Sequence, residues 1–426
     1  MILGIDGYLG WSLALRMLRR GHAVYGIDNL STRYNAALAG EGSAFPLPEP
    51  KERERYLREL GDLAALQVAD ITQPGVLRGA VEAFRPDVVV HFAEQRAAPF
   101  SMMDEERAVY TMYNNVIGTV RLVYALKDRP DVHLLKMGTM GEYGTPNYDI
   151  PEAAYVEFTY RGKSDLVPVP KFAGSWYHWT KVHDTHNLLF ANRVWGLTIT
   201  DVNQGPVYGT RTSDMMASGV LEDPTAQVDE RLRTRIDVGD AFGTVINKNI
   251  ARALVSMALY HKEGRKLPLY QYGKAKQVRG FISLEDSVNA LETLVNNPPS
   301  QGDFRVVNQF HELLTTGEII FAIRDHMLSA FGYEIPIEWI EDPRVEKEEH
   351  YYNPEKKVLP SLGFRPKYSF RQLLPSMVED MRRYLDRLLA YKDVVGEVRI
   401  GWRTGIGYSK RVLRSEGEET GGPGRT

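Results

Sequence analysis

Hydrophobic runs of strand length alternate with segments of helical periodicity through the first 205 residues. Continuous apolar runs separated by amphipathic helices are typical of a parallel sheet that is covered by helices on both faces. The pattern predicts an α/β fold with a doubly wound parallel sheet. Its six expected strands are Met1–Leu3, Ala23–Ile27, Leu66–Ala69, Val88–Phe92, His133–Met137 and Leu197–Val202.

The regular alternation fades in the second half of the chain. We expect residues 1–205 to form the sheet domain, residues 206–400 a smaller α/β substrate-binding lobe, and residues 401–426 a tail whose Gly- and Glu-rich end is disordered. Two segments are expected to return to the first domain: an amphipathic helix within residues 240–262 and an extra strand at residues 303–309.

Two local patterns lie inside the first domain. Tyr155–Tyr160 and Asp165–Val169 flank the turn sequence Arg161–Ser164, which predicts a β-hairpin; we expect it as an edge ribbon. An insertion between Thr32 and Gly61 contains the charged stretch Glu52–Tyr56, which predicts a solvated helix, with a contact to a second subunit as the alternative.

A glycine-rich turn follows the first apolar run. Gly4, Gly7 and Gly10 precede a helical pattern, and a second strand then ends in Asp28. Glycines allow the backbone to approach a pyrophosphate at a helix N-terminus, while the acid accepts the adenosine ribose hydroxyls. This order predicts a Rossmann-type dinucleotide site rather than an ordinary glycine turn, with Tyr8 and Leu9 among its contacts.

The acid at position 28 also bears on the choice of cofactor. A carboxylate there repels a ribose 2′-phosphate, so NAD is favoured over NADP. Arg33 is the only nearby feature that favours NADP, and it has two other interpretations: stacking on adenine or facing solvent.

A Tyr-x-x-x-Lys pair is the candidate for chemistry. Tyr177 and Lys181 are four residues apart, so on a helix they share one face. A cation beside a phenol lowers its pKa and makes it a base for a sugar hydroxyl. An exposed pair of this kind is usually inert, but together with a dinucleotide site it predicts a redox centre.

The composition limits the class of protein and its possible partners. The chain has 426 residues, 43% apolar and 25% charged, which is ordinary for a soluble globular protein, and no apolar run is long enough to span a membrane. No export signal begins the sequence, so we expect a cytoplasmic protein. Zero cysteines exclude disulfides and thiolate metal sites, and no metal site is expected. A net charge of -3 indicates no nucleic-acid partner.

Further motifs stand in register with these features: Asp70-Ile71, His91–Glu94, Asn115–Thr119 and Pro206–Gly209. With the glycine turn and the Tyr-Lys pair, the sequence resembles the extended short-chain dehydrogenase/reductase family of nucleotide-sugar enzymes. Longer strings are similar to one subgroup, which makes UDP-sulfoquinovose from UDP-glucose and sulfite. These strings are Glu94–Pro99, Tyr113–Thr119, Gly138–Asn147, Tyr177-His178, Lys181–Asp184, Asn203–Gly205 and Pro343–Glu346 with Glu349–Asn353.

The resemblance implies a reaction with tightly held NAD. The sugar is oxidised at C4, loses water across C5 and C6, takes up sulfite at C6 and is reduced again at C4. Tyr177 is the implied base at the 4-hydroxyl, with Thr139 bonded to the same oxygen and Lys181 on the ribose. The implied cofactor contacts are Gly4, Gly7, Tyr8, Leu9, Gly10, Asp28, Asn29, Arg33, Asp70, Ile71, Arg96, Asn114, Asn115, Tyr177, Lys181 and Gln204. The implied substrate contacts are Arg96, Thr139, Asn203, Arg279 and Arg344.

Two missing carboxylates separate this sequence from related 4,6-dehydratases. Those relatives carry Thr-Asp-Glu, and aligned on Thr139 the two acids become Met140 and Gly141. Glu142 and His178 are the nearest titratable groups that can replace them. Each has an alternative role, Glu142 as the partner of a Lys or Arg on a loop and His178 as a structural neighbour of the base.

Several alternatives stay open. A UDP-glucose 4-epimerase or a 4,6-dehydratase shares everything except the Met140–Glu142 change, and a catalytically silent NAD-sensing protein shares the scaffold. The resemblance further implies a homodimer formed through helices around residues 104–127 and 176–195, and sulfite arrives either free or through a donor protein.

Overall fold

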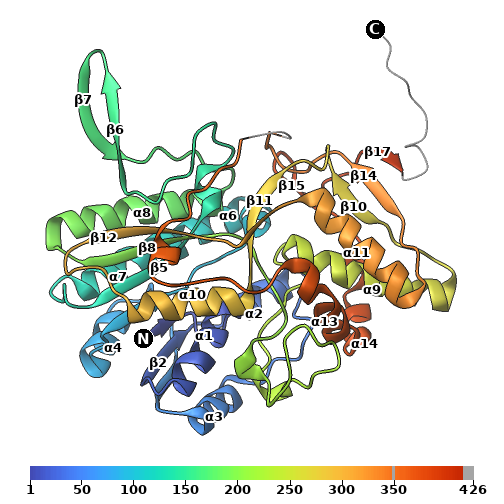
Figure 1. The fold of residues 1–426 in the computed structure, drawn as a ribbon, viewed down its shortest axis with the longest axis horizontal. Helices are drawn as coiled ribbons and strands as arrows, with labels where there is room; N and C mark the ends of the chain where they lie inside the picture. The colour runs from blue at the N-terminus through green and yellow to red at the C-terminus, as the bar shows by residue number, and fades with distance from the viewer. Residues whose placement is uncertain (348–350, 416–426) are drawn as a thin grey trace.

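The computed structural model describes residues 1–347 and 351–415. At its centre is a seven-stranded parallel sheet with the order β12-β8-β5-β4-β1-β2-β3 (Figure 1). The doubly wound fold is therefore confirmed, and the extra strand predicted at residues 303–309 is its seventh member. The strands are β1 (Ile2–Leu3), β2 (Val24–Asp28), β3 (Leu63–Val68), β4 (Val88–His91), β5 (His133–Thr139), β8 (Thr198–Gln204) and β12 (Phe304–Gln309).

Helices cover both faces of this sheet. Successive strand residues alternate between the two cores: Leu134 packs with one set of helices and Leu135 with the other. The first set is α4 (Val76–Phe84), α7 (Gly118–Leu126) and α8 (Trp176–Trp195), and the second includes α1 (Tyr8–Arg19) and α10 (Leu284–Asn296). The carboxyl ends of β1, β4 and β5 therefore meet at one edge, where parallel sheets bind ligands.

The second half forms a lobe with its own apolar core. Helix α9 (Val245–Glu263) packs against α11 (Thr316–Phe331), α13 (Phe370–Arg382) and β10 (Leu269–Tyr272) within this core. The predicted helix at residues 240–262 thus exists but lies in the lobe and does not return to the sheet. Its apolar face matches the lobe core, which the sequence pattern cannot distinguish from a sheet face.

Smaller elements complete the two units. In the lobe, β10 pairs with β14 (Ile337–Ile340) and β14 with β17 (Val412–Ser415), while β11 (Val278–Ser283) joins β9 (Val207–Tyr208) to β13 (Glu312–Thr315). The short helices are α5 (Ala98–Ser101), α6 (Glu105–Met112), α12 (Val358–Ser361), α14 (Leu385–Ala390) and α15 (Lys392–Val395), with a π-helix at Tyr113–Ile117 and 3₁₀ turns at Met140–Tyr143, Ser213–Met215 and Glu230–Leu232.

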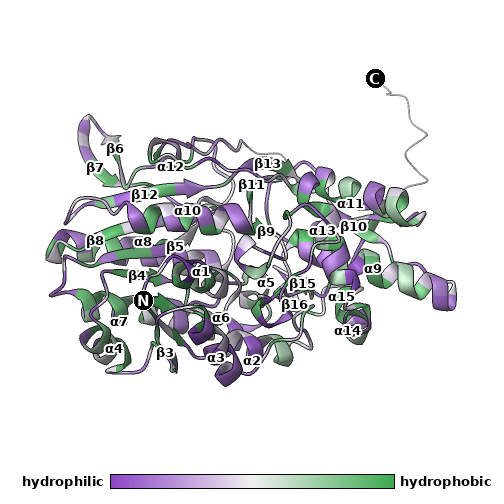
Figure 2. Ribbon diagram, turned by 60° about the horizontal axis from the view of Figure 1, so that its bottom comes forward, coloured by the Kyte–Doolittle hydropathy of each residue, from purple (hydrophilic) through white to green (hydrophobic). Residues whose placement is uncertain are grey.

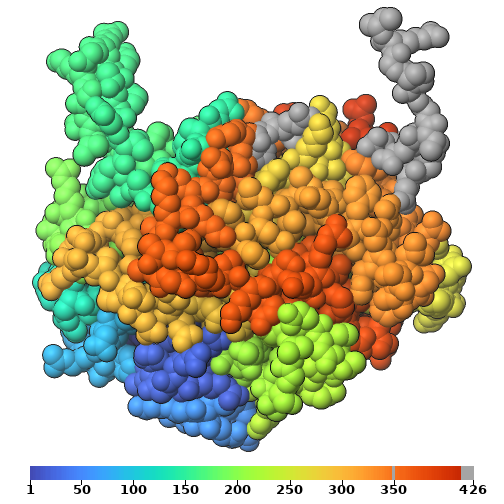
Figure 3. All heavy atoms as spheres, viewed as in Figure 1, coloured from blue at the N-terminus to red at the C-terminus, as the bar shows by residue number. Residues whose placement is uncertain are grey.

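The predicted hairpin is present as β6 (Tyr155–Tyr160) and β7 (Lys163–Pro168). It stands away from the body of the molecule (Figures 1 and 3). The two strands pair only with each other among the described strands, so the expectation of an edge ribbon on a larger sheet is wrong.

The insertion forms α2 (Ser31–Leu38) and α3 (Pro50–Leu60), and α3 is strongly hydrophilic (Figure 2). It is not simply solvated, because Arg53 on its inner face is fully buried. The Arg53 guanidinium lies 3.7 Å from the centre of the Trp11 ring and pairs with Asp6 in the glycine turn. The predicted solvated helix is therefore corrected to one that is fastened to the cofactor-binding turn.

The beginning of the expected tail is ordered. Strands β15 (Ile400–Gly401) and β16 (Gly405–Ile406) form a short hairpin against the rest of the molecule. The end predicted to be disordered, residues 416–426, lies outside the described residues.

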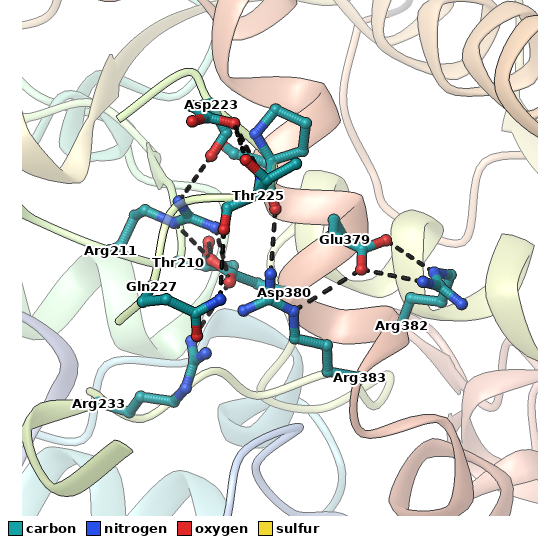
Figure 4. A network of polar contacts seen from close by, with 12 residues as sticks. Thr210, Arg211, Asp223, Thr225, Gln227, Arg233, Glu379, Asp380, Arg382 and Arg383 are labelled. Carbon is teal, nitrogen blue, oxygen red and sulfur yellow. Dashed lines mark hydrogen bonds and ion pairs between the residues drawn. The ribbon is translucent and has the colours of Figure 1, made fainter. Parts of the chain in front are cut away.

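A buried charge cluster within the lobe joins the loop after β9 to helix α13 (Figure 4). Asp380 on α13 is fully buried and accepts bonds of 2.8 and 2.7 Å from Arg211 and one of 2.6 Å from Thr210. Arg233 lies 3.5 Å from the same carboxylate. This loop continues to Phe242 at the cavity described below, so the cluster stabilises one wall of the site.

We expect Asp380→Asn to lower the free energy of unfolding by about 2 kcal/mol, because it weakens the charge-assisted hydrogen bonds from Arg211 and removes the charge that faces Arg233. Urea unfolding measures this change. The neighbouring Glu379→Gln is the matched control: its partner Arg382 is 46% exposed, so the loss there is expected to stay below about 1 kcal/mol. Equal losses in the two variants would contradict the role assigned to Asp380.

Candidate active site

A cavity of about 920 Å³ opens at the carboxyl edge of the sheet, between the sheet domain and the lobe. One end is formed by the glycine turn and β2, the middle by β5 and the start of α8, and the other end by lobe residues. No helix in the described part of the chain is long and apolar enough to cross a membrane.

The glycine turn fits a dinucleotide. A Cβ atom at Gly4 would lie 2.8 Å from the backbone of Phe92, and one at Gly10 would lie 2.0 Å from the Gly4 carbonyl oxygen. Helix α1 begins directly after Gly7 with no side-chain cap, which leaves its first backbone N–H groups for a ligand. Gly4, Gly7, Tyr8, Leu9 and Gly10 all line the cavity. These are the features that a pyrophosphate requires.

The acid at the end of β2 also lines the cavity. Asp28 accepts hydrogen bonds of 2.8 and 2.7 Å from the backbone N–H groups of Asp6 and Leu30. Burial raises the pKa of its carboxyl to about 6, with the nearby Asp6 acting in the same direction. Arg33 does not line the cavity, because it makes a bidentate pair with Asp6 at 2.7 Å. Its guanidinium is therefore engaged, which removes the one argument for NADP.

The Tyr-Lys pair stands on the first turns of α8, which Ser175 caps. Both side chains line the cavity, and the Lys181 ammonium lies 5.7 Å from the centre of the Tyr177 ring. It donates to the Met137 carbonyl at 2.8 Å and pairs with Glu94. Burial raises the pKa of the Tyr177 phenol to about 12, against the opposing effect of Lys136. The direction is opposite to the predicted one, since burial outweighs the cations.

Glu142 lies behind the cavity wall rather than in it. It is fully buried in the turn after β5, and its carboxylate accepts from the Thr139 N–H at 3.2 Å. Lys171 lies 2.5 Å from the same carboxylate and Lys136 lies 3.9 Å away. Thr139 itself lines the cavity. A direct acid or base role for Glu142 does not fit this geometry; it holds the turn that carries Thr139.

His178 lines the cavity next to the base. Its ring lies over Gly141, where a Cβ atom would meet the imidazole Nε2 at 2.5 Å. Ser175 Oγ lies 2.9 Å from Nδ1. Burial lowers the pKa of His178 to about 4, and Arg344 and Arg279 act in the same direction against Glu346. The imidazole is neutral at pH 7 and sits where a longer side chain at position 141 would collide with it.

The shifted histidine makes stability depend on pH. Because its folded pKa of about 4 lies below the ordinary value of 6.5, the unfolded chain binds the proton first as pH falls. The free energy of unfolding is therefore expected to decrease between about pH 6.5 and pH 4, and His178→Gln to make that decrease smaller. Urea unfolding at several pH values tests this; an unchanged slope in the variant would contradict it.

Three predicted arginines reach the cavity: Arg96, Arg279 and Arg344. Arg96 pairs with Asp237 and lies 3.3 Å from the Phe242 carbonyl, with 34% of its side chain exposed. Arg279 lies 2.5 Å from Glu346. Three guanidinium groups around one cavity suit a substrate with a diphosphate.

The remaining predicted contacts divide into two groups. Asn29, Ile71, Asn114 and Gln204 line the cavity. Asp70, Asn115 and Asn203 do not: Asp70 accepts from Thr72, Asn115 binds the Gln95 backbone, and Asn203 donates to Asn308. These three side chains are occupied in holding loops and strands, so their assignment as ligand contacts is corrected.

Sequence reasoning missed several groups around the site. Glu94 pairs with Lys181; Lys248, from α9, and Trp402, from the C-terminal hairpin, line the cavity. Lys136 and Lys171 lie behind it. Glu94 was visible within a quoted string, but Lys248 and Trp402 come from segments far along the chain with no local signal.

Comparison with known proteins agrees with this geometry. Residues 1–223 match the NAD dependent epimerase/dehydratase family. The chain belongs to this family. The UDP-sulfoquinovose synthase of Sulfolobus acidocaldarius is 49% identical over 93% of this chain and 95% of its own length. The chloroplastic UDP-sulfoquinovose synthase of Spinacia oleracea is 38% identical over 97% of this chain and 81% of its own.

The epimerase/dehydratase fold is also seen in solved structures. The UDP-glucose 4-epimerase of Thermotoga maritima superposes with a TM-score of 0.60 at 18% identity, covering 90% of this chain and 98% of the other. Membership of the epimerase/dehydratase family confirms the predicted resemblance and NAD as the cofactor. A nucleotide sugar is the class of substrate.

Proposed function

We propose that this protein synthesises UDP-sulfoquinovose from UDP-glucose and sulfite. The observation that carries the proposal is the match to UDP-sulfoquinovose synthases along nearly the whole chain, 49% identical over 93% of it. The geometry supports it at the point where dehydratases carry acids: Met140 and Gly141 occupy those places, and the His178 imidazole fills the space over Gly141.

The residues of the cavity take the following roles. Tyr177 removes the proton of the sugar 4-hydroxyl, and Thr139 hydrogen-bonds the same oxygen. The glycine turn would hold NAD, which would supply a reversible hydride acceptor for C4. With C4 as a ketone, the C5 proton is acidic, and His178, which lines the cavity and is neutral at pH 7, takes it. His178 passes that proton to the C6 hydroxyl, which leaves as water and gives an enone. Sulfite then adds at C6 as bisulfite, whose proton goes to C5, and Tyr177 returns its proton to O4 when C4 is reduced.

Electrostatics support anionic ligands at two places. Arg279 and Arg344 are proposed to bind the diphosphate of UDP-glucose. Arg96 is proposed to attract sulfite, because its side chain is partly exposed in the cavity while Asp237 fixes one of its nitrogens. In this proposal, the incoming sulfite replaces Asp237 as the partner of the Arg96 guanidinium.

The experiment is a product analysis. Purified protein is incubated with UDP-glucose, with and without sulfite, and the products are identified by mass spectrometry. We expect a sulfonated nucleotide sugar only when sulfite is present, with no net change in NAD. Formation of UDP-galactose or a 4-keto-6-deoxy sugar at the same rate with and without sulfite would favour an epimerase or a 4,6-dehydratase instead.

A homodimer is proposed from one exposed apolar face. Helices α6 and α7 and the π-helix between them pack against α8, and these helices carry large apolar side chains that are half exposed or more. These are Val109, Tyr113, Tyr124, Phe190 and Val194. Analytical ultracentrifugation of wild type and Phe190→Glu tests this: a dimer that dissociates in the variant is expected, and a monomeric wild type would contradict it.

Two further proposals concern the location of the protein in the cell and the source of its sulfite. A cytoplasmic location is proposed because the chain has no cysteine. A protein that delivers sulfite is proposed as an alternative to free sulfite; co-purification from cell extract followed by a sulfite-free activity assay distinguishes the two sources.

A further inference from the structure

The β15–β16 hairpin lies across one end of the cavity and touches both units. On the lobe side, the Trp402 backbone N–H donates to the Pro343 carbonyl at 2.8 Å. On the sheet side, the Ile406 N–H donates to the Met103 carbonyl at 3.1 Å. The contact is close, since a Cβ atom at Gly405, whose φ is +64°, would lie 2.4 Å from the Met103 oxygen. The hairpin therefore bridges the opening between the two units.

The first residues of the hairpin are also held by hydrogen bonds to Asp240. The backbone N–H groups of Arg399 and Ile400 donate to one Asp240 oxygen at 2.9 and 3.2 Å. The other oxygen of Asp240 accepts from Lys248 at 3.2 Å, and Lys248 lines the cavity. The position of the hairpin is thus coupled to a cation of the site.

Trp402 is the hairpin side chain that faces the cavity. Its indole N–H donates to the Gly174 carbonyl at 2.6 Å, directly before the helix that carries Tyr177. The Arg344 guanidinium lies 5.3 Å from the centre of its ring. One side chain therefore connects the loop before the catalytic helix to a proposed substrate arginine.

We propose that Trp402 is a positioning residue: it closes the cavity over the reacting sugar and holds Arg344 against the substrate, so that the keto intermediates stay bound until sulfite adds. This inference rests on the proposed function, which passes through a 4-ketone and an enone that have to survive until a second substrate arrives. Closing segments serve this purpose when a reactive intermediate has to be kept from water.

Three variants test the inference. Trp402→Ala removes the ring and the N–H; Trp402→Phe keeps a ring beneath Arg344 but loses the bond to Gly174. Arg403→Ala is the matched control, since that neighbouring side chain is exposed. Each protein is given UDP-glucose without sulfite, passed through a filter that retains protein, and the filtrate is reduced with borodeuteride so that released ketones carry deuterium. Calorimetry measures UDP-glucose binding.

For Trp402→Ala we expect the released ketone per mole of enzyme to rise, and UDP-glucose binding to weaken, each on the order of tenfold, the size of a lost cation–π contact and hydrogen bond. Trp402→Phe is expected to release ketone but to bind UDP-glucose nearly as wild type does. Values for Trp402→Ala equal to those of Arg403→Ala would overturn the inference. If wild type makes the sulfonated product and the variants do not differ from it, only the role of Trp402 is wrong. If wild type forms no ketone, the proposed function is wrong, and so is the role of Trp402 in retaining intermediates.

Discussion

Replacing Tyr177 by Phe is expected to lower the turnover rate by about a hundredfold to ten-thousandfold, because the variant keeps the ring but lacks the group that takes the proton from the 4-hydroxyl. Its side chain is partly exposed and lines the cavity, where it can contact a bound sugar. NAD content and UDP-glucose binding are expected to persist, since neither the glycine turn nor the arginines change.

The measurement is the transient absorbance of NADH after UDP-glucose is added, followed in a stopped-flow instrument. Tyr34→Phe serves as the control, because Tyr34 is 66% exposed and does not line the cavity. A rate within threefold of wild type for Tyr177→Phe would exclude Tyr177 as the base, while a simultaneous loss of bound NAD would indicate a structural effect instead.

The sequence predicted the parts of the fold that rest on local patterns. Strand periodicity located the sheet, and the glycine turn with Asp28 located the dinucleotide end of the cavity. These signals are strong because one short segment contains all that the geometry requires. The same holds for Tyr177 and Lys181, which share a face of one helix.

The features that the sequence did not predict depend on contacts between segments that are far apart in the chain. The sequence of α3 reads as a solvated helix, yet Arg53 is buried by Trp11 and Asp6, which belong to another element. Trp402 stands more than two hundred residues after the catalytic helix that it touches, with a sequence separation of 228 to Gly174. Residues so far apart in the sequence meet only in the folded chain, and no local periodicity predicts their contact.

Glu142 shows how the structure separates two roles that the sequence left open. Its motif position suggested an acid or base beside the sugar, but its carboxylate lies among Lys171, Lys136 and Thr185 with no exposed surface. The nearby Asp201 lies 3.7 Å from Lys136 and accepts from Thr185 at 2.6 Å. Two buried ammonium groups are thus neutralised by two buried carboxylates.

We therefore expect Glu142→Ala to lower the free energy of unfolding by about 3–5 kcal/mol, since it leaves two buried ammonium groups to share Asp201. Glu157→Ala, on the exposed hairpin, is the control and is expected to change stability by less than about 0.5 kcal/mol. Urea unfolding measures both. A loss below about 1 kcal/mol for Glu142→Ala would show that the carboxylate does not compensate these charges.

The more conservative Glu142→Gln tests the chemical role separately. In deuterated water without sulfite, wild type is expected to exchange the C5 hydrogen of UDP-glucose, through reversible removal of that proton from the ketone. Because Glu142 does not reach the cavity, the exchange rate of Glu142→Gln is expected to stay within about tenfold of wild type, whereas His178→Ala loses at least a hundredfold, as for loss of a general base. The opposite order of the two variants would return the base role to Glu142 and leave His178 as a neighbour of Tyr177.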